Sequence, residues 1–428
     1  MGKKNWNFWI DKGGTFTDVI ALSPDNNLFL EKVLSQSQSE NDDPISTGIK
    51  KILNDNSGNF DNIGNVTVGT TRATNTLLER TGEKTLLIVP KGFKDSQLIG
   101  YQSREDIFAL EITKPMPIYS KVIELDIRLT KSGHDFIKPN WIVIKDELKQ
   151  IKMENFKSIC VSLIHGWRFP HYEIKIKNIL SQLGHKNITL GHEISKTIKF
   201  IRRTHTSLVH AYVDPIIRKD IDNLKKEINF DINNISLRYM QSNGGLAEEK
   251  NFRGINSILS GPAGGVMGAI SVANNSGFDK IITFDMGGTS TDVSHFDGEL
   301  EYKNEKMIDN QALQVPIIDI DTIAAGGGSI LDYKNSRMTV GPKSAGSYPG
   351  PMSYGKNGPL TVTDANLFLG KIIEKYFPKK FGVDGRSSLD RQIITEEFNQ
   401  LREKIDPEML PEDVAEGFIK IAVEKMCR

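Results

Sequence analysis

The fold is decided by a nine-residue stretch, Asp11-Lys-Gly-Gly-Thr-Phe-Thr-Asp-Val19, which recurs 274 positions later as Asp285-Met-Gly-Gly-Thr-Ser-Thr-Asp-Val293. Seven of the nine residues are identical, and each copy lies between two apolar segments that are typical of strands. The repeat therefore predicts two related halves, each with a strand–turn–strand hairpin. A chain of 428 residues is long enough for two or three domains of about 150 residues.

Both copies contain two adjacent glycines, which permit positive φ and let a backbone approach a phosphate with its N–H groups turned inward. The candidate phosphate ligands are Gly13, Gly14, Thr15 and Thr17 in the first copy and Gly287, Gly288, Thr289 and Thr291 in the second. Asp11 and Asp285 end the preceding apolar strands, where a charge needs a cation, so we expect them to hold Mg²⁺ directly or through its waters. Two ordinary hairpins with Asp/Gly turns are the alternative, which the duplication disfavours.

A third glycine cluster, Gly326-Gly327-Gly328, follows the apolar segment 315–325. It is a further candidate for contacting nucleotide or substrate, and a plain flexible turn is the alternative.

Composition excludes several classes of function. Lys+Arg (54) and Asp+Glu (54) cancel, so no global basic field exists to hold nucleic acid or a membrane surface. The N-terminus does not resemble a secretory signal, and no apolar run approaches the ~18 residues of a membrane span. Cys160 and Cys427 form no CxxC pair, and His205 and His210 lack metal-ligand spacing. We expect a cytoplasmic protein without nucleic-acid or membrane partners.

Strands that alternate with helices predict an α/β fold. We place the first domain at residues 6–200 and a second, incomplete domain at residues 201–428. The segment 340–364 is rich in Gly, Pro and Ser, which favours a surface loop. Residues 411–426 have the period of an amphipathic helix, and no capping residue follows. We therefore expect a C-terminally truncated fold whose last helix leaves an apolar face exposed.

Duplicated DxGGT hairpins resemble the actin-like ATPase superfamily, in which two α/β domains hold ATP and Mg²⁺. Further motifs narrow the resemblance to the hydantoinase A/5-oxoprolinase family over nearly the whole chain. They are GTTRATNTLLERTG (69–82), KGFKD (91–95), SNGGL (242–246), SGPAGG (260–265), FDMGGTSTDVS (284–294), AAGGGS (324–329) and TVTDANLFLG (361–370). Three segments look most like the 5-oxoprolinase branch: FWIDKGGTFTDV (8–19), YQSREDIFALEI (101–112) and LGKIIEKYFPKKFG (369–382).

The resemblance implies ATP-dependent hydrolysis of 5-oxo-L-proline to L-glutamate, with ATP and Mg²⁺ as cofactors. It assigns the glycines and threonines of both turns to the phosphates, and Asp11 and Asp285 to Mg²⁺ and the catalytic water. Thr70, Thr71 and Asn75 are weaker candidates for lining the substrate cleft. In the alternative interpretation, their side chains only cap the end of a strand or the start of a helix.

The resemblance leaves other functions open. Hydrolysis of N-methylhydantoin or another cyclic amide, or the ATP-using subunit of a ketone carboxylase, would use the same ATPase half. An actin-like nucleotide switch is the non-enzymatic alternative. Family members continue beyond this length with a further C-terminal region or a hydantoinase B-like subunit, so we expect such a partner, an oligomer, and little activity from these residues alone.

Overall fold

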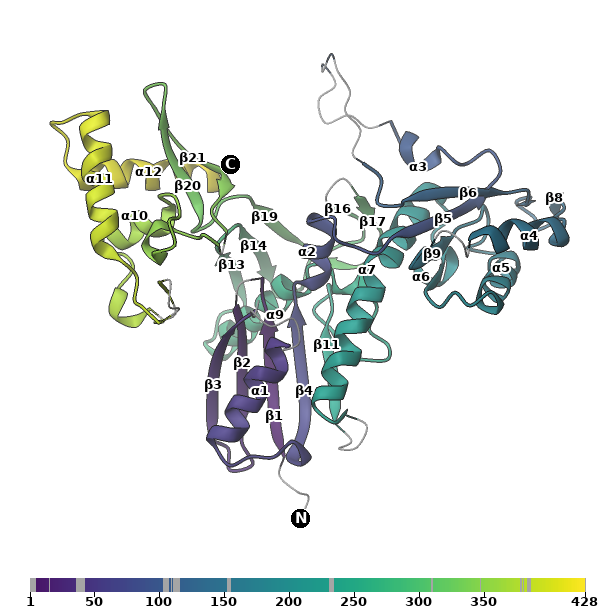
Figure 1. Ribbon diagram of the computed structural model, residues 1–428, viewed down its shortest axis with the longest axis horizontal. Helices are drawn as coiled ribbons and strands as arrows, with labels where there is room; N and C mark the ends of the chain where they lie inside the picture. The colour runs from purple at the N-terminus through teal and green to yellow at the C-terminus, as the bar shows by residue number, and fades with distance from the viewer. Residues whose placement is uncertain are drawn as a thin grey trace. The chain divides into compact units, whose positions relative to one another are not determined.

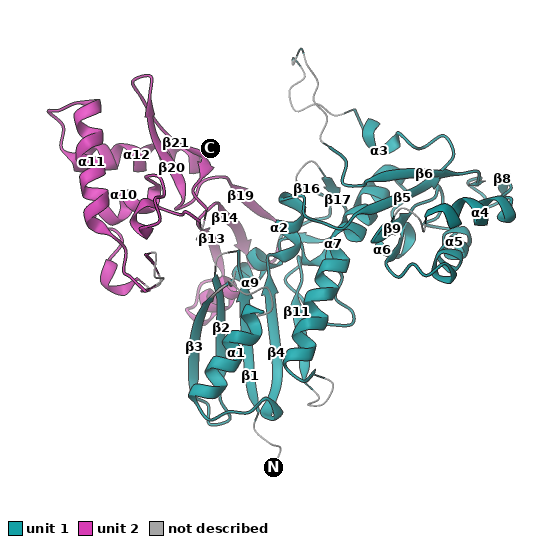
Figure 2. Ribbon diagram, in the orientation of Figure 1, with its two compact units in different colours: residues 1–267, 301–318 teal, residues 268–300, 319–428 magenta. Residues whose placement is uncertain are grey.

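The computed structural model describes residues 5–14, 16–35, 43–102, 108, 110, 116–151, 155–230, 235–308, 311–346, 348–377, 379, 381–382 and 386–427. The chain forms two compact units, which Figure 2 shows in different colours. Unit 1 contains residues 1–267 and 301–318, and unit 2 contains residues 268–300 and 319–428. The division predicted at residue 200 falls within unit 1, at the first residue of a long helix.

The first sheet of unit 1 has the strand order β12-β11-β4-β1-β2-β3. Its strands are β1 (Trp6–Lys12), β2 (Phe16–Leu22), β3 (Leu28–Leu34), β4 (Ile63–Thr70), β11 (Ser236–Met240) and β12 (Leu246–Glu248). β1 is antiparallel to β2. Both β1 and β11 are parallel to β4, which lies between them. Phe8 and Ile10 in β1, and Val19 and Ala21 in β2, are buried at alternate positions, as the two-residue period of a strand requires.

Helices α1 (Pro44–Asp55) and α7 (Phe200–Glu227) contribute to the hydrophobic core of this sheet, as do Ala73 and Leu77. Figure 1 shows α1 lying across β1 and β2. Gly48 of α1 sits against Val19, because a Cβ at this glycine would lie 2.6 Å from the Val19 side chain. The helix therefore packs directly on the strand that follows the first glycine turn.

The second sheet of unit 1 is parallel throughout, in the order β10-β9-β5-β6. Its strands are β5 (Thr85–Pro90), β6 (Lys121–Leu125), β9 (Ser158–Val161) and β10 (Ile188–Leu190). All six residues of β5 are buried, as expected for an apolar strand covered on both faces. Helices α4 (Trp141–Ile151) and α5 (His171–Gln182) supply side chains to its core.

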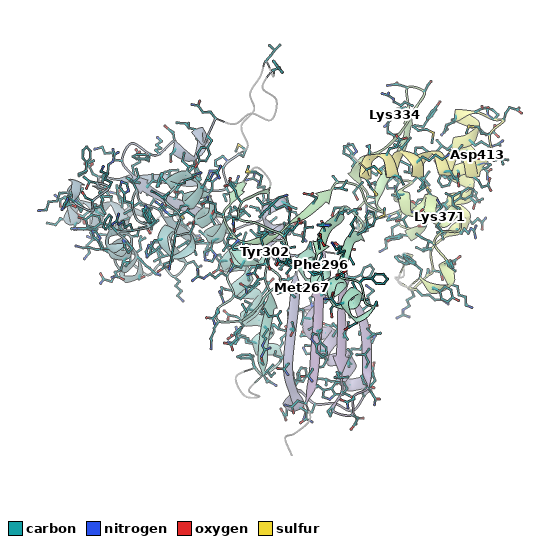
Figure 3. The ribbon with its side chains drawn as sticks, turned by 180° about the vertical axis from the view of Figure 1, so that it is seen from behind. Met267, Phe296, Tyr302, Lys334, Lys371 and Asp413 are labelled. Atoms are coloured by element: carbon teal, nitrogen blue, oxygen red, sulfur yellow. The ribbon has the colours of Figure 1, made fainter. Side chains whose placement is uncertain are left out.

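Unit 2 contains an antiparallel sheet of β13 (Lys280–Met286), β14 (Thr291–Asp297) and β19 (Ile320–Ile323), and a hairpin of β20 (Ser329–Lys334) and β21 (Arg337–Ser344). Helices α10 (Val362–Phe368), α11 (Arg391–Ile405) and α12 (Pro411–Met426) build its core with β20 and β21. Figure 3 labels Lys334 at the tip of this hairpin and Asp413 in the first turn of α12. Helix α9 (Ser260–Asn275) contains the division between the units.

Shorter elements complete the described chain. They are η1 (Phe60–Asn62), α2 (Arg72–Leu78), α3 (Ser96–Ile99), β7 (Arg128–Leu129), β8 (Asp135–Ile137), α6 (Gly191–Ile194), η3 (Gly254–Ser257), β15 (Tyr302–Lys303), β16 (Lys306–Ile308), β17 (Gln311–Leu313), β18 (Ile317–Ile318), η4 (Met352–Tyr354) and η5 (Glu374–Tyr376). Among the residues described, no helix has the length and apolarity that crossing a membrane would require.

The α/β fold and the two hairpins are confirmed, but two sequence expectations are wrong. The segment 340–364 is not a surface loop throughout, because its first residues belong to β21 and both Ser353 and Leu360 are buried. The Asp364 carboxylate accepts hydrogen bonds from the backbone N–H groups of Ser353 (2.9 Å) and Thr361 (2.8 Å), which ties this segment to α10. Its backbone polar groups therefore have partners away from water.

The apolar face of α12 is the second correction. We expected it to be exposed, but Val414, Ala415 and Phe418 are fully buried in the core of unit 2. Helices α10 and α11 cover this face, so the apolar side chains that gave the helix its period have partners within the described chain.

Candidate functional site

The first glycine turn joins β1 to β2 in unit 1. The backbone N–H of Gly13 donates to the carbonyl of Phe16 at 3.0 Å and closes the turn. Asp11 stands opposite Asp18 in the strand register, and its side chain is exposed. Thr15, a predicted phosphate ligand, lies outside the described residues.

The start of helix α2 lies beside this turn. Thr71, at the N-terminus of α2, donates its backbone N–H to the carbonyl of Lys12 at 3.1 Å. A Cβ on Gly14 would lie 3.4 Å from Nδ2 of Asn75. The structure thus places Thr71 and Asn75 next to the first turn, and their assignment to a substrate cleft stays a prediction. Thr70 fits the structural alternative, because its buried hydroxyl accepts the Arg72 N–H at 3.1 Å.

The second turn, in unit 2, repeats the geometry of the first. The backbone N–H of Gly287 donates to the carbonyl of Ser290 at 2.9 Å, which is the equivalent of the Gly13–Phe16 hydrogen bond. Asp285 stands opposite Asp292, at the positions equivalent to Asp11 and Asp18. The sequence repeat is therefore a repeat of structure.

The glycines of the two turns are not in the left-handed region, contrary to expectation. Gly13, Gly14, Gly287 and Gly288 all have φ outside the range from +20° to +160°. A Cβ on Gly288 would meet no atom within 4 Å. Within the described chain, neither backbone strain nor crowding therefore requires glycine at position 288. What the missing side chain does provide there is open space beside the backbone.

Gly326, Gly327 and Gly328 pack against the second turn. The N–H groups of Gly327 and Gly328 donate to the carbonyls of Gly287 (2.9 Å) and Gly288 (2.6 Å). A Cβ on Gly326 would lie 2.7 Å from the Gly287 carbonyl oxygen. This cluster is therefore a close backbone junction that fixes the second turn, which explains the three glycines better than flexibility does.

We expect Gly326→Ala to destabilise the protein, because the new methyl group would meet backbone atoms that cannot move independently. Overpacking of this kind costs about 1–3 kcal/mol of unfolding free energy. Urea unfolding would measure it, and Gly288→Ala is the matched control since a Cβ there meets nothing within 4 Å. Equal stability of the two variants would contradict the junction.

The threonines and aspartates of the repeat differ in burial. Thr17 and Thr291 are fully buried, and their hydroxyls are hydrogen-bonded to the Ser35 hydroxyl (2.9 Å) and the Ala325 carbonyl (2.6 Å). Their hydroxyl groups therefore stabilise the hairpins. This geometry does not support the phosphate-binding role predicted for Thr17. Thr289, by contrast, is exposed.

Asp11 and Asp285 are both exposed, so the expectation that each sits where a charge needs a cation is not met. Exposed carboxylates can still take part in a Mg²⁺ site, because Mg²⁺ keeps several waters and is held by one or two carboxylates plus substrate phosphates. Among the described residues no cluster of three or more His, Cys, Asp or Glu side chains could hold a metal by itself. Each hairpin has its predicted carboxylate, Asp11 or Asp285, on one strand and a second aspartate, Asp18 or Asp292, opposite it.

Sequence reasoning missed two groups near the turns. The ammonium group of Lys12 is paired with the Asp43 carboxylate at 2.7 Å, so its charge is neutralised within unit 1. A Cβ on Gly327 would lie 2.6 Å from the Thr363 hydroxyl, which places α10 beside the glycine junction. The Thr361-x-x-Asp364 spacing was an available signal for the start of α10, but not for its contact with Gly327.

The remaining candidates for other chemistry are structural. Cys160 is fully buried, and burial raises the pKa of its thiol, which makes it a poor nucleophile. Burial lowers the pKa of His205 and of His210, both on α7. The His210 side chain is buried and that of His205 is half-buried, so both fit a structural role within unit 1.

Family models match most of the chain. The hydantoinase/oxoprolinase N-terminal region matches residues 7–184, and the hydantoinase/oxoprolinase model matches residues 203–428, more than half of the chain. The chain belongs to the hydantoinase/oxoprolinase family. Both glycine turns fall within the matched residues, the first in the N-terminal model and the second in the other.

Several relatives of known name align along the chain. A 5-oxoprolinase of Dictyostelium discoideum is 40% identical over 100% of this chain and 38% of its own length. A 5-oxoprolinase of Saccharomyces cerevisiae is 39% identical, over 100% of this chain and 37% of its own. The caprolactamase subunit alpha of Pseudomonas jessenii is 32% identical over 87% of this chain and 56% of its own. The chain thus spans little more than a third of the two 5-oxoprolinases.

Two solved structures share the fold. The ATP-dependent caprolactamase of Pseudomonas jessenii superposes with a TM-score of 0.78 at 30% identity, covering 98% of this chain and 62% of that one. The nucleotide-free acetone carboxylase superposes with a TM-score of 0.77 at 23% identity, covering 96% and 61%. The second likeness concerns the fold alone.

Proposed function

We propose that this chain is the ATP-binding part of an enzyme that opens a small cyclic amide, with 5-oxo-L-proline as the first candidate substrate and L-glutamate as its product. The observation that carries the proposal is the repeated turn. Among the described residues, a Cβ on Gly288 meets nothing within 4 Å and one on Gly14 meets the Asn75 amide at 3.4 Å, which supports a close approach of phosphates to this backbone. Relatives named 5-oxoprolinase, at about 40% identity over the whole chain, support the choice of substrate.

The chemistry explains why ATP is needed. A lactam is stabilised by resonance, its oxygen is a weak nucleophile and its nitrogen is a poor leaving group. Transfer of the γ-phosphoryl group from ATP to the lactam oxygen, with ADP as the leaving group, activates the ring carbon toward attack by water. The ring C–N bond then breaks and phosphate is released. In such reactions the protein contributes mainly positioning and neutralisation of charge.

The roles proposed for the residues follow from their places. Backbone N–H groups of the two turns bind the phosphates, and Thr289 adds an exposed hydroxyl group. Asp11 and Asp285 hold Mg²⁺, directly or through water, and orient the nucleophile. Mg²⁺ would supply neutralisation of charge on the transferred phosphoryl group. Thr71 and Asn75, beside the first turn, are the side chains that could distinguish substrates.

Other functions in the family use the same parts. Because one relative is named caprolactamase subunit alpha, a different lactam is our second candidate substrate. The word subunit in that name also suggests a partner subunit. We include such a subunit, or a further region of the same chain, and an oligomeric assembly in the proposal. The likeness to acetone carboxylase shows only the fold and does not favour ketone carboxylation.

Substrate-dependent ATP hydrolysis by the complete gene product tests the proposal. Phosphate release would be measured with 5-oxoproline, N-methylhydantoin, caprolactam, or acetone with bicarbonate, and glutamate would be assayed directly. We expect stimulation by 5-oxoproline with one glutamate formed per phosphate released. Stimulation by another compound alone would replace the substrate, and ATP binding without any stimulated turnover would favour a nucleotide switch.

A further inference from the structure

A pocket separate from the glycine turns lies in unit 1, where strands β5 and β6 end. Its volume is about 470 Å³, within the range of small-molecule sites. It is lined by Gly92, Phe93, Lys94, Asp95, Ser96, Ile99, Glu124 and Ile201. Ligands of parallel α/β sheets bind outside the carboxyl ends of the strands, which is where this pocket opens.

Glu124 of β6 is held in this pocket by backbone groups. Its Oε1 accepts hydrogen bonds from three consecutive N–H groups, those of Gly92 (2.8 Å), Phe93 (3.0 Å) and Lys94 (3.0 Å). Gly92 has φ of +87°, a conformation that glycine adopts without strain and that turns successive N–H groups to one side. Charge-assisted hydrogen bonds of this kind fix the carboxylate in place.

The second oxygen of Glu124 remains available as an acceptor. Within the part of the chain that the structure describes, no hydrogen bond or ion pair to Oε2 is present. The pocket is therefore lined by a carboxylate that is already oriented, so a bound donor would not have to order this side chain.

The other lining residues select the kind of ligand. Phe93, Ile99 and Ile201 provide apolar walls, whereas Lys94 (+1), Asp95 (−1) and Glu124 (−1) give a formal charge of −1. A negative pocket with apolar walls disfavours a simple carboxylate ligand. It suits a positively charged N–H donor on an apolar body.

We propose that this pocket binds a small molecule with a primary ammonium group, which donates to Oε2 of Glu124 while its apolar body contacts Phe93, Ile99 and Ile201. This binding site is independent of the glycine turns and of the function proposed for them. The ligand class follows from the fixed carboxylate, the charge and the walls together.

Calorimetric titration with n-butylammonium chloride tests the proposal. We expect saturable binding to the wild-type chain and at least about tenfold weaker binding to Glu124→Gln. The amide oxygen of glutamine still accepts the three N–H groups, whereas its NH₂ group replaces the free acceptor by a donor. The expected loss corresponds to one charge-assisted hydrogen bond.

Two further variants keep the test independent of whether Glu124→Gln folds normally. Ile99→Trp should fill the pocket and abolish binding, and its side chain is 48% exposed, so the fold can accept the larger ring. Ile142→Trp, at an exposed position of α4, is the matched control and should bind as the wild type does.

Five results would overturn the proposal, four of them through the binding of n-butylammonium or butyrate. These four are no saturable n-butylammonium binding to the wild type, unchanged binding to Glu124→Gln, unchanged binding to Ile99→Trp, and equal or tighter binding of butyrate. Tighter binding of neutral 2-pyrrolidinone than of n-butylammonium would likewise replace the ammonium group by a lactam N–H as the recognised donor.

Discussion

Asp285→Asn in the complete gene product should reduce ATP turnover by at least about 100-fold while leaving the fold unchanged. Asp285 is the penultimate residue of β13, two positions before Gly287. Asparagine keeps the shape of the side chain but removes the charge that a Mg²⁺ ion needs. Because Asp285 is exposed, the unfolding free energy should change by less than about 0.5 kcal/mol. Steady-state phosphate release at several Mg²⁺ concentrations, with thermal melting, measures both effects.

The control for this variant is Asp297→Asn. Asp297 is also exposed and lies at the other end of the same hairpin, where it pairs with Lys280 at 2.7 Å. We expect this control to keep wild-type turnover. Asp285→Asn with wild-type turnover and unchanged Mg²⁺ dependence would remove Asp285 from the metal site and leave the proposal without its second carboxylate.

Gly288→Val and Gly14→Val should each weaken ATP binding by at least about tenfold without lowering the melting temperature. Among the residues that the structure describes, a Cβ on Gly288 has open space around it, and one on Gly14 meets only the Asn75 amide at 3.4 Å. The fold can therefore accept a branched side chain at either position, but a phosphate that approaches the backbone there cannot.

Calorimetric titration with ATP, alongside thermal melting, would measure this separation of binding from stability. Gly326→Ala is the informative contrast, since its Cβ would meet the backbone of Gly287 and should lower stability. If either valine variant bound ATP as tightly as the wild type and melted normally, its turn would not be a phosphate site.

Local patterns in the sequence determined the elements that carry the site. The apolar runs on either side of each DxGGT copy gave β1, β2, β13 and β14, because a strand needs only alternating or continuous apolar residues and a turn. The continuous apolar run of β5 at residues 85–90 is the same kind of local signal. Adjacent glycines were enough to identify both turns.

One local signal was present but not used. The two-residue period of β2 places Thr17 on the same side as Val19 and Ala21, both of which are fully buried. The burial of the Thr17 hydroxyl could therefore have been predicted from the strand itself. The phosphate role was assigned from residue type instead.

Only the tertiary structure decided what the other glycines do. Gly326 and Gly287 are 39 positions apart, and the need for glycine at residue 326 arises from a backbone contact that no local pattern encodes. Contacts between distant residues also decide which unit a segment of the chain belongs to. Residues 301–318 return to unit 1, where the backbone N–H of Gln314 donates to the Thr206 hydroxyl at 3.0 Å. Hydrophobic period and turn chemistry act over a few residues and so determine elements, whereas contacts between distant segments decide which of those elements meet.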